Sequence, residues 1–215
     1  MIAYKFLREG RVGPFSGVTW PAAGEWLDAT GGDGACSPRV HACRVEDLPE
    51  WMDHELWRVE LDGDIRVDCG KLVADRGRLV ERVAGCDADL MAAFAEACAL
   101  RARDAALTLL PAGPARDALV ACETAEQLVA TAAALATDDA LGPDEARAAG
   151  YAGDAARHVI GARVAPPTAP THAAVNGFIA AAAAAFAEDD LGAVARERAW
   201  QADWIATRAL LQAAG

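Results

Sequence analysis

Gly85-Cys86-Asp87-Ala88-Asp89-Leu90-Met91 is the stretch at which this chain of 215 residues changes character. Asp87 is a typical helix N-cap, because its carboxylate can accept a hydrogen bond from a backbone amide of the first helical turn. After it, apolar residues recur at the spacing of one helix face, at Met91, Phe94, Cys98, Ala102, Ala105 and Leu109. The stretch therefore predicts a boundary between a region of strands and turns and a region of helices.

The composition divides at the same boundary. Residues 1–85 hold 8 of the 54 alanines and residues 86–215 hold the other 46, whereas four of the six tryptophans lie within the first 57 residues. Alanine has the highest intrinsic helix propensity but buries little apolar area, so the larger residues must form most of the core. The two parts are expected to depend on each other for stability.

The first part predicts short strands joined by turns. Residues 2–7 and 57–61 have strand character, and Asp62-Gly63 is a turn dipeptide that makes residues 64–68 the return strand of a hairpin. Residues 46–54 predict one short helix. Further strands are expected at residues 18–20, 25–29, 40–44, 71–74 and 78–83.

The second part predicts helices separated by proline and glycine. After the first helix we expect helices over residues 114–136, 144–150, 151–162, 171–188 and 191–213. Short connections imply antiparallel neighbours and hence a bundle. The predicted fold is α+β: a small mixed or antiparallel sheet with one short helix in residues 1–86, packed on a helical bundle in residues 87–215 as one cooperative unit.

The charge of the chain excludes several classes of partner. The net charge is −12 and no run of Lys or Arg occurs, which disfavours binding to nucleic acid or to an anionic membrane surface. The N-terminus lacks the apolar stretch of a secretory signal, and the most apolar run, residues 175–187, is shorter than the ~20 residues that span a bilayer. We therefore expect a cytoplasmic protein whose cysteines are reduced.

Cys36, His41 and Cys43 form the group most suggestive of chemistry. On a strand, His41 and Cys43 point to the same face, so the imidazole could activate the thiol as a nucleophile. With His54 or Cys69 as a fourth ligand the group could hold zinc, although paired CxxC spacing is missing. The third interpretation is a core thiol beside a hydrogen-bonded histidine. The sequence assigns no metal site and leaves His41 and Cys43 as candidate catalytic residues.

Aromatic and basic residues are dense in the same region. Tryptophan offers a large apolar face with a polar N–H, and arginine holds anionic groups. We therefore expect a ligand cleft between the sheet region and the bundle, lined by Trp20, Trp26, Arg39, Arg44, Trp57 and Arg58. Nothing in the sequence identifies a cofactor.

Two further features lie in the helical part. Asp154 and His158 are four residues apart on a predicted helix, where the carboxylate could raise the basicity of the histidine. Trp200, Trp204 and Leu211 share one stripe of the last helix and could form the face of a homodimer.

Several short sequences in the first part carry a resemblance. They are Gly13-Pro14-Phe15-Ser16-Gly17, Trp20-Pro21, Gly24-Glu25-Trp26, Val40-His41-Ala42-Cys43-Arg44, Leu56-Trp57-Arg58-Val59-Glu60-Leu61 and Arg76-Gly77-Arg78-Leu79-Val80. Together they resemble a group of uncharacterised actinobacterial proteins of about this length, a resemblance that implies no activity. The strand Tyr4-Lys5-Phe6 followed by a His-bearing strand is similar, at the level of fold, to ADP-ribosyltransferase-like β domains, but a full set of their polar residues is missing.

Three functions follow as hypotheses. The leading one is a cytoplasmic binding or accessory protein that takes a small molecule or a peptide in the Trp/Arg-lined cleft. The alternative is an enzyme of group transfer or hydrolysis that uses His41 and Cys43. The third is a structural protein that dimerises through its C-terminal helix.

Overall fold

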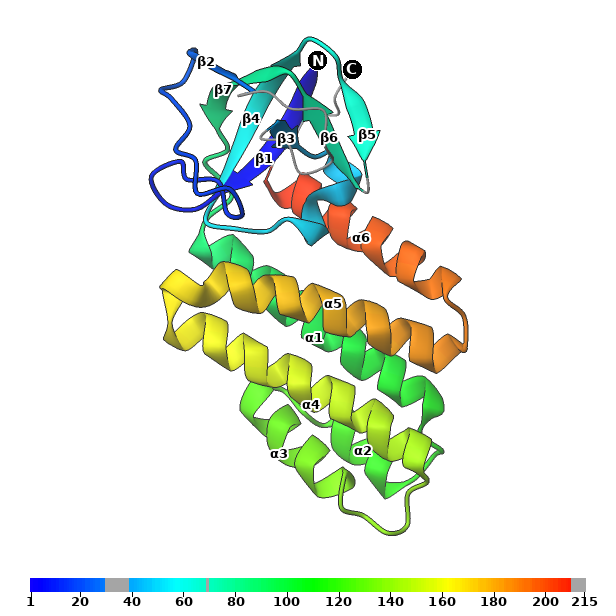
Figure 1. Cartoon of the computed structure of the whole chain (residues 1–215). Helices are drawn as coiled ribbons and strands as arrows, with labels where there is room; N and C mark the ends of the chain where they lie inside the picture. The colour runs from blue at the N-terminus through cyan, green and yellow to red at the C-terminus, as the bar shows by residue number, and fades with distance from the viewer. Residues whose placement is uncertain (30–38, 69, 210–215) are drawn as a thin grey trace. The chain divides into compact units, whose positions relative to one another are not determined.

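A computed structural model describes residues 1–29, 39–68 and 70–209 of the chain (Figure 1). The contacts divide the chain into two compact units, one formed by Met1–Leu90 together with the chain from Ala202 onward, the other by Met91–Gln201. The fold is α+β, as predicted. The division differs from the predicted one at the C-terminus, because the end of the last helix groups with the N-terminal residues rather than with the other helices.

The N-terminal unit contains two antiparallel sheets and one short 3₁₀ helix, η1 (Val45–Glu50). The first sheet has the order β1-β4-β7-β2, and its strands are β1 (Ile2–Leu7), β4 (Glu55–Asp62), β7 (Arg76–Arg82) and β2 (Trp26–Asp28). The second has the order β3-β6-β5, and its strands are β3 (Val40–Ala42), β6 (Lys71–Ala74) and β5 (Arg66–Asp68). The predicted hairpin after β4 is wrong: the chain does turn at Gly63, at φ +86°, but β5 pairs with β6 in the second sheet and not with β4.

The core of this unit takes apolar side chains from both sheets. Leu7, Val59 and Leu79 come from the first sheet, Val40 and Leu72 from the second, and all five are nearly inaccessible to water. On β1 the alternate residues are buried as well, because Tyr4 and Phe6 are each 2% exposed on the other face. A strand that is covered on both faces has little tolerance for a charged side chain.

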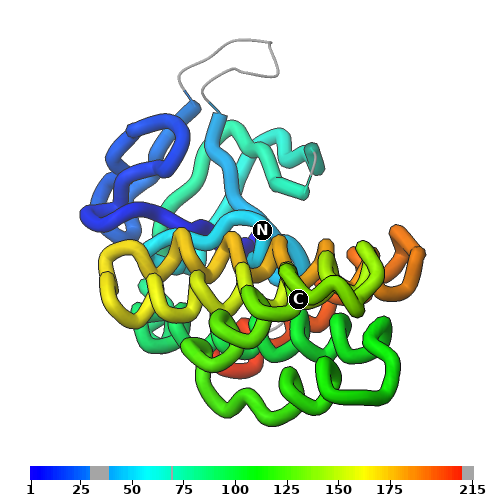
Figure 2. Tube along the Cα trace, turned by 90° about the horizontal axis from the view of Figure 1, so that it is seen from below, coloured from blue at the N-terminus to red at the C-terminus, as the bar shows by residue number. Residues whose placement is uncertain are grey.

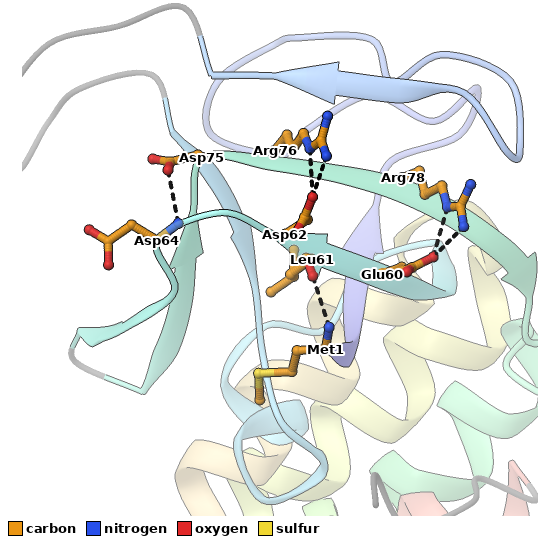
Figure 3. Close-up of polar contacts among 8 residues, drawn as sticks. All are labelled: Met1, Glu60, Leu61, Asp62, Asp64, Asp75, Arg76 and Arg78. Carbon is orange, nitrogen blue, oxygen red and sulfur yellow. Dashed lines mark hydrogen bonds and ion pairs between the residues drawn. The ribbon is translucent and has the colours of Figure 1, made fainter.

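A ladder of ion pairs crosses the exposed face of β4 and β7. The Nε atom of Arg78 donates to Glu60 and that of Arg76 to Asp62, each at 2.8 Å, as Figure 3 shows. Nη1 of Arg58 donates to Glu81 at 2.8 Å further along the same strand pair. These pairs connect residues that lie opposite each other in the register of the two strands.

Six α-helices make up most of the rest of the described chain. They are α1 (Ala88–Leu109), α2 (Pro114–Val120), α3 (Ala125–Leu135), α4 (Pro143–Val164), α5 (Ala169–Glu188) and α6 (Gly192–Arg208). Within the second unit α4 packs between α3 and α5, and the tube in Figure 2 shows the chain reversing from α4 into α5. A second core, which includes Leu119, Leu128 and Leu135, holds α2 and α3 against α4.

Two helix boundaries differ from the sequence-based expectation. The predicted helix over residues 114–136 is two helices, because Thr124 begins a new one: its side chain accepts a hydrogen bond from the Gln127 amide while the Gln127 side chain caps Thr124. The two helices predicted over residues 144–150 and 151–162 are the single helix α4, which continues through Gly150. The low helix propensity of that glycine is outweighed by packing on both sides of it.

The Thr124 cap gives the first test of this architecture. Replacing Thr124 with Ala removes the side-chain acceptor and should lower the free energy of unfolding by about 1 kcal/mol, whereas Thr124→Ser should keep most of it. Urea denaturation followed by circular dichroism measures both variants. An equal loss in the two variants would show that the hydroxyl does not act as the cap.

Candidate ligand-binding site

His41 and Cys43 lie at the end of β3, beside a single backbone bridge to β1. The Tyr4 amide donates to the Cys43 carbonyl at 2.9 Å, and the Cys43 amide donates to the Tyr4 carbonyl at 2.7 Å. Beyond this bridge the two strands separate, because β1 continues in the first sheet and β3 in the second. A small pocket lies in the wedge between them.

The backbone of Phe6 faces this wedge. Met1 and Leu61 exchange both hydrogen bonds, so Ala3, Lys5 and Leu7 bond to β4 while Tyr4, Phe6 and Arg8 point away from it. Tyr4 is paired with Cys43, and Arg8 is paired with Val12. Among the described residues the N–H and C=O of Phe6 have no hydrogen-bond partner, so a donor and an acceptor remain available at the edge of β1.

The side-chain amine of Lys5 also lies at the wedge between β1 and β3. Its neighbours on that face of β1, Ala3 and Leu7, belong to the core, so only the end of the side chain reaches the wedge. There Nζ donates to the carbonyl oxygen of His41 at 2.6 Å and lies 5.5 Å from the centre of the Trp20 ring. Within the described part of the chain, no carboxylate lies at ion-pair distance from Lys5.

The environment of Lys5 alters its titration. Burial disfavours the charged amine and lowers the pKa of Lys5 to about 8. At pH 7 most molecules therefore still carry the charge, without an opposite charge beside it. An uncompensated, partly buried cation of this kind attracts an anionic group.

An aromatic pair forms the rim of the pocket. The sequence Gly13-Pro14-Phe15-Ser16-Gly17 forms a tight turn in which the Gly17 amide donates to the Gly13 carbonyl at 2.9 Å. This turn presents Phe15, whose side chain is 85% exposed, edge-on to the Trp51 ring at a centroid distance of 6.0 Å. Trp51 is held in turn by a hydrogen bond from Nε1 to the Gly70 carbonyl.

We call the hollow between β1 and β3 the wedge pocket. Its volume is about 40 Å³, and its walls are Tyr4, Lys5, Phe6, Pro14, Phe15, His41, Ala42, Cys43 and Trp51. That volume suits one small head group, with the rest of a ligand lying across the aromatic rim. One cation, one free N–H and a flat apolar wall match a carboxylate on an aromatic or peptidic body.

The electrostatics at Cys43 do not favour the nucleophile hypothesis. Cys43 is 2% exposed, and burial raises the pKa of its thiol to about 12. Burial, followed by the charges of Lys71 and Lys5, lowers the pKa of His41 below its ordinary value. A neutral imidazole beside a protonated thiol gives no thiolate for attack, so the core-thiol interpretation agrees best with the geometry.

The zinc hypothesis rests partly on residues without a described position. Cys36 and Cys69 lie outside the described residues, as does the Gly31–Gly34 loop. Within the described ranges no three histidine, cysteine or acidic side chains gather in a way that could hold a metal ion. Zinc at His41 and Cys43 stays a hypothesis.

Of the six predicted ligand-binding residues, two flank Lys5. Trp20 is buried against the lysine amine, and Trp57 lies opposite Lys5 in the register of β1 and β4. The Trp57 ring is half-buried and donates from Nε1 to Glu55 at 2.9 Å. Both rings form the support behind the amine rather than the lining of an open cleft.

The other four predicted residues lie apart from the wedge pocket. Trp26 packs on the guanidinium groups of Arg76 and Arg78, whose central carbons lie 4.6 and 4.8 Å from its ring centre. Arg39 pairs with Asp75, and Arg58 pairs with Glu81. Arg44 lies on the other side of the Tyr4–Cys43 bridge.

Arg44 borders a second, wider hollow of about 530 Å³ in the same unit. Its walls are Met1, Ile2, Ala3, Tyr4, Arg44, Val45, Glu46, Asp203, Ala206 and Thr207. The guanidinium of Arg44 is 3.5 Å from the carboxylate of Glu46, and Asp203 adds a further negative charge. This groove has the size of a ligand site, but the formal charges along it, those of the Met1 ammonium, Arg44, Glu46 and Asp203, sum to zero. We therefore take the wedge pocket, with its partly buried amine, as the candidate site.

The stripe predicted for dimerisation already contacts arginines of the same chain. Arg101 lies 4.2 Å from the Trp200 ring centre, and Arg208 lies 3.9 Å from that of Trp204. Leu211 lies outside the described residues. The homodimer stays a prediction.

Comparison with known proteins assigns no function to this chain. The chain matches no protein-family model, and neither the curated proteins nor the solved structures include a significant match. The resemblance to the actinobacterial group therefore stays a prediction.

In the described part of the chain, no helix is both long and apolar enough to cross a membrane.

Of the nine residues that line the wedge pocket, the sequence analysis assigned only His41 and Cys43 to a site; Lys5 and Phe6 are the most important of the seven that it did not assign. Lys5 carried a usable signal, because it is one of only two lysines and stands between Ala3 and Leu7 on the apolar face of a strand. A charged residue at such a position marks a site or a strained core. Nothing in the sequence indicated that the Phe6 backbone would lack a partner.

The chemistry of Cys43 can be tested by alkylation. Because the buried thiol has a pKa of about 12, iodoacetamide at pH 8 should leave Cys43 unmodified in the folded protein and modify it after denaturation in urea. Peptide mapping by mass spectrometry reads each cysteine separately, and the half-buried Cys122 is the internal reference. Modification of native Cys43 at the rate of Cys122 would restore the nucleophile hypothesis.

The lowered pKa of Lys5 makes stability depend on pH. Between pH 8 and the ordinary lysine value of 10.5 the unfolded chain binds more protons at this residue than the folded chain, so the contribution of Lys5 to stability rises with pH in that window. Lys5→Met removes the buried charge and should be more stable than the parent by about 1–3 kcal/mol at pH 7. This advantage should shrink toward zero by about pH 10.5.

Urea unfolding at several pH values, with Lys71→Met as the matched control, measures this difference. Lys71 pairs with Asp68 and lies outside the core. A stability difference between Lys5→Met and the parent that does not vary with pH would contradict the assignment.

Proposed function

We propose that this protein binds a small ligand or a peptide end through a carboxylate held in the wedge pocket. The observation that carries the proposal is the Lys5 amine, partly buried and without a carboxylate partner among the described residues, beside the free N–H of Phe6. A carboxylate there would accept from both groups, and such charge-assisted hydrogen bonds are stronger than neutral ones.

The rest of the pocket supports a particular ligand shape. The edge-on pair of Phe15 and Trp51 offers an apolar surface at the mouth, which suits an aromatic or flat aliphatic group. The free carbonyl of Phe6 could also accept from an amide N–H of the ligand, as in the pairing of a peptide with a strand edge. A phosphate or dinucleotide fits less well, because one amine and one N–H are few donors for it.

The enzyme and dimer hypotheses have less support. The protonated thiol of Cys43 offers no nucleophile, and the two tryptophans of the C-terminal helix are covered by arginines of the same chain. A location of the site against the helical bundle remains a prediction. We keep the expectation of a cytoplasmic protein, which the free thiols of Cys43, Cys86, Cys98 and Cys122 support.

Binding of matched aromatic probes tests the proposal. Phenylacetate should bind the protein while phenylacetamide, which has the same shape and no charge, should not. N-acetylphenylalanine adds an amide that can pair with Phe6, so tighter binding of this probe would favour a peptide end over a simple acid. Isothermal titration calorimetry at pH 7 measures all three, and the fluorescence of Trp51 and its neighbours gives a second signal.

Two variants that each remove one positive charge separate the site from general charge effects. Lys5→Met should weaken carboxylate binding at least tenfold, which corresponds to about 1.4 kcal/mol. Arg157→Met, on the exposed face of α4 in the other unit, changes the net charge by the same amount and should leave binding unaltered. Equal binding of acid and amide, or equal losses in the two variants, would overturn the proposal.

A further inference from the structure

The general base that the sequence predicted in the helical unit is not observed. Asp154 pairs with Arg157, while Nδ1 of His158 lies 2.8 Å from Nδ1 of His172, the distance of a hydrogen bond between the two rings. These two histidines therefore satisfy each other. By contrast, the amine of Lys5 in the wedge pocket has only a carbonyl oxygen as its hydrogen-bond partner among the described residues.

Lys5 is the side chain of the wedge pocket best suited to nucleophilic attack. Burial lowers the pKa of Lys5 to about 8, so about a tenth of the amines are neutral at pH 7 and about half at pH 8. A neutral amine has a free electron pair, and desolvation in an apolar pocket is one way in which proteins activate a lysine. The Cys43 thiol, with a pKa of about 12, stays protonated over this range.

The groups of β3 beside the amine carry no charge that would keep it protonated. The thiol of Cys43 is neutral near pH 8. The imidazole of His41 is neutral there as well, because burial, followed by the charges of Lys71 and Lys5, lowers the pKa of His41. Neither group therefore opposes the loss of the proton from Lys5.

The other neighbours of the amine are mainly aromatic. Trp20 contributes an apolar ring, and Trp57 lies opposite Lys5 in the register of β1 and β4. Glu55 is the carboxylate two residues before Trp57 on β4, and it accepts hydrogen bonds from the Trp57 ring and the Gly10 amide rather than from Lys5. The amine thus faces apolar surface and the wedge pocket.

The hydrogen bond to His41 leaves the electron pair of the neutral amine free. Nζ donates one hydrogen to the His41 carbonyl at 2.6 Å, and a carbonyl oxygen offers no hydrogen in return. The electron pair is disposed tetrahedrally to that N–H bond and so points away from the carbonyl. Because Lys5 borders the wedge pocket, a small electrophile in the pocket can approach it.

We propose that Lys5 captures the carbonyl group of a 2-oxo acid as an imine, an inference that rests on the proposed binding of a carboxylate in the wedge pocket. In a 2-oxo acid the carbonyl carbon is bonded directly to the carboxylate carbon. The free N–H of Phe6 can hold the carboxylate while the neighbouring carbonyl lies at the amine. An aromatic body on the acid would lie against Phe15 and Trp51.

The reaction is a condensation that needs no oxidant or reductant. The amine attacks the carbonyl carbon, a C–N bond forms, the π electrons move to the oxygen, and this oxygen takes a proton released from nitrogen. The hydroxyl then leaves as water with a second proton, which nitrogen gives up as the C=N bond forms. The half-buried imidazole of His41, on the pocket wall, is suited to pass these protons.

Trapping of the imine tests the proposal. The full chain is incubated with phenylpyruvate and cyanoborohydride at pH 8, where hydride converts an imine to a stable secondary amine, and the labelled residues are identified by peptide mapping. The chain has only two lysines, so Lys71, which pairs with Asp68, is the internal reference. We expect Lys5 to be labelled at least ten times faster than Lys71.

Two controls separate the imine from simple binding. Phenyllactate, which has a hydroxyl in place of the carbonyl, should bind without leaving a label and should slow the labelling of Lys5 but not of Lys71. Lys5→Arg keeps the positive charge but lacks the nucleophilic amine, so its labelling should fall to that of Lys71 and the N-terminal amine. The mapping of the parent chain does not depend on how this variant folds.

The outcomes distinguish the two proposals. If phenyllactate binds in calorimetry but Lys5 is labelled no faster than Lys71, the imine is wrong while carboxylate binding stands. If phenyllactate does not bind and Lys5 is not labelled, the proposed function fails as well. Labelling of Lys5 that phenyllactate does not slow would show a reaction that does not use the pocket, which would also overturn the assignment to 2-oxo acids.

Discussion

The backbone bridge between Tyr4 and Cys43 is the constraint on which the N-terminal unit depends. It attaches β1, the edge strand of one sheet, to the end of β3 in the other sheet. Because the bridge is one residue long, the strands separate on both sides of it, and each separation leaves a hollow. The unpaired Phe6 backbone, the position of the Lys5 amine and the burial of Cys43 all follow from this junction.

The charge at this junction is unusual for the chain that contains it. A protein with a net charge of −12 has carboxylates in excess, yet the Lys5 amine has none at ion-pair distance among the described residues. Nearly every arginine described on the neighbouring strands has such a partner, as the β4–β7 ladder illustrates. A perturbed, unpaired charge in a hollow is a physical reason to propose a site there, and the proposed binding site rests on this exception.

The sequence predicted the positions of strands and helices better than it predicted which of them lie side by side. Strand alternation at residues 2–7 and the change of character at Gly85-Cys86-Asp87 were sufficient for the α+β class, because both signals are local. The wedge pocket was not predictable in this way, since it depends on which strand lies beside Tyr4. The break before α3 was readable in Thr124 and Gln127 but was hidden by the continuous alanine-rich pattern around them.

The ion pairs of β4 and β7 have a consequence for folding. Exposed pairs of this kind add little stability one by one, but their order along the strands favours one alignment. If β7 slid by two residues in one direction, Arg78 would face Arg58. In the other direction Glu60 would face Val80 and would lose its arginine partner. The order of the charges therefore favours the observed alignment of β4 and β7, two strands that β5 and β6 separate along the chain, over alignments shifted by two residues.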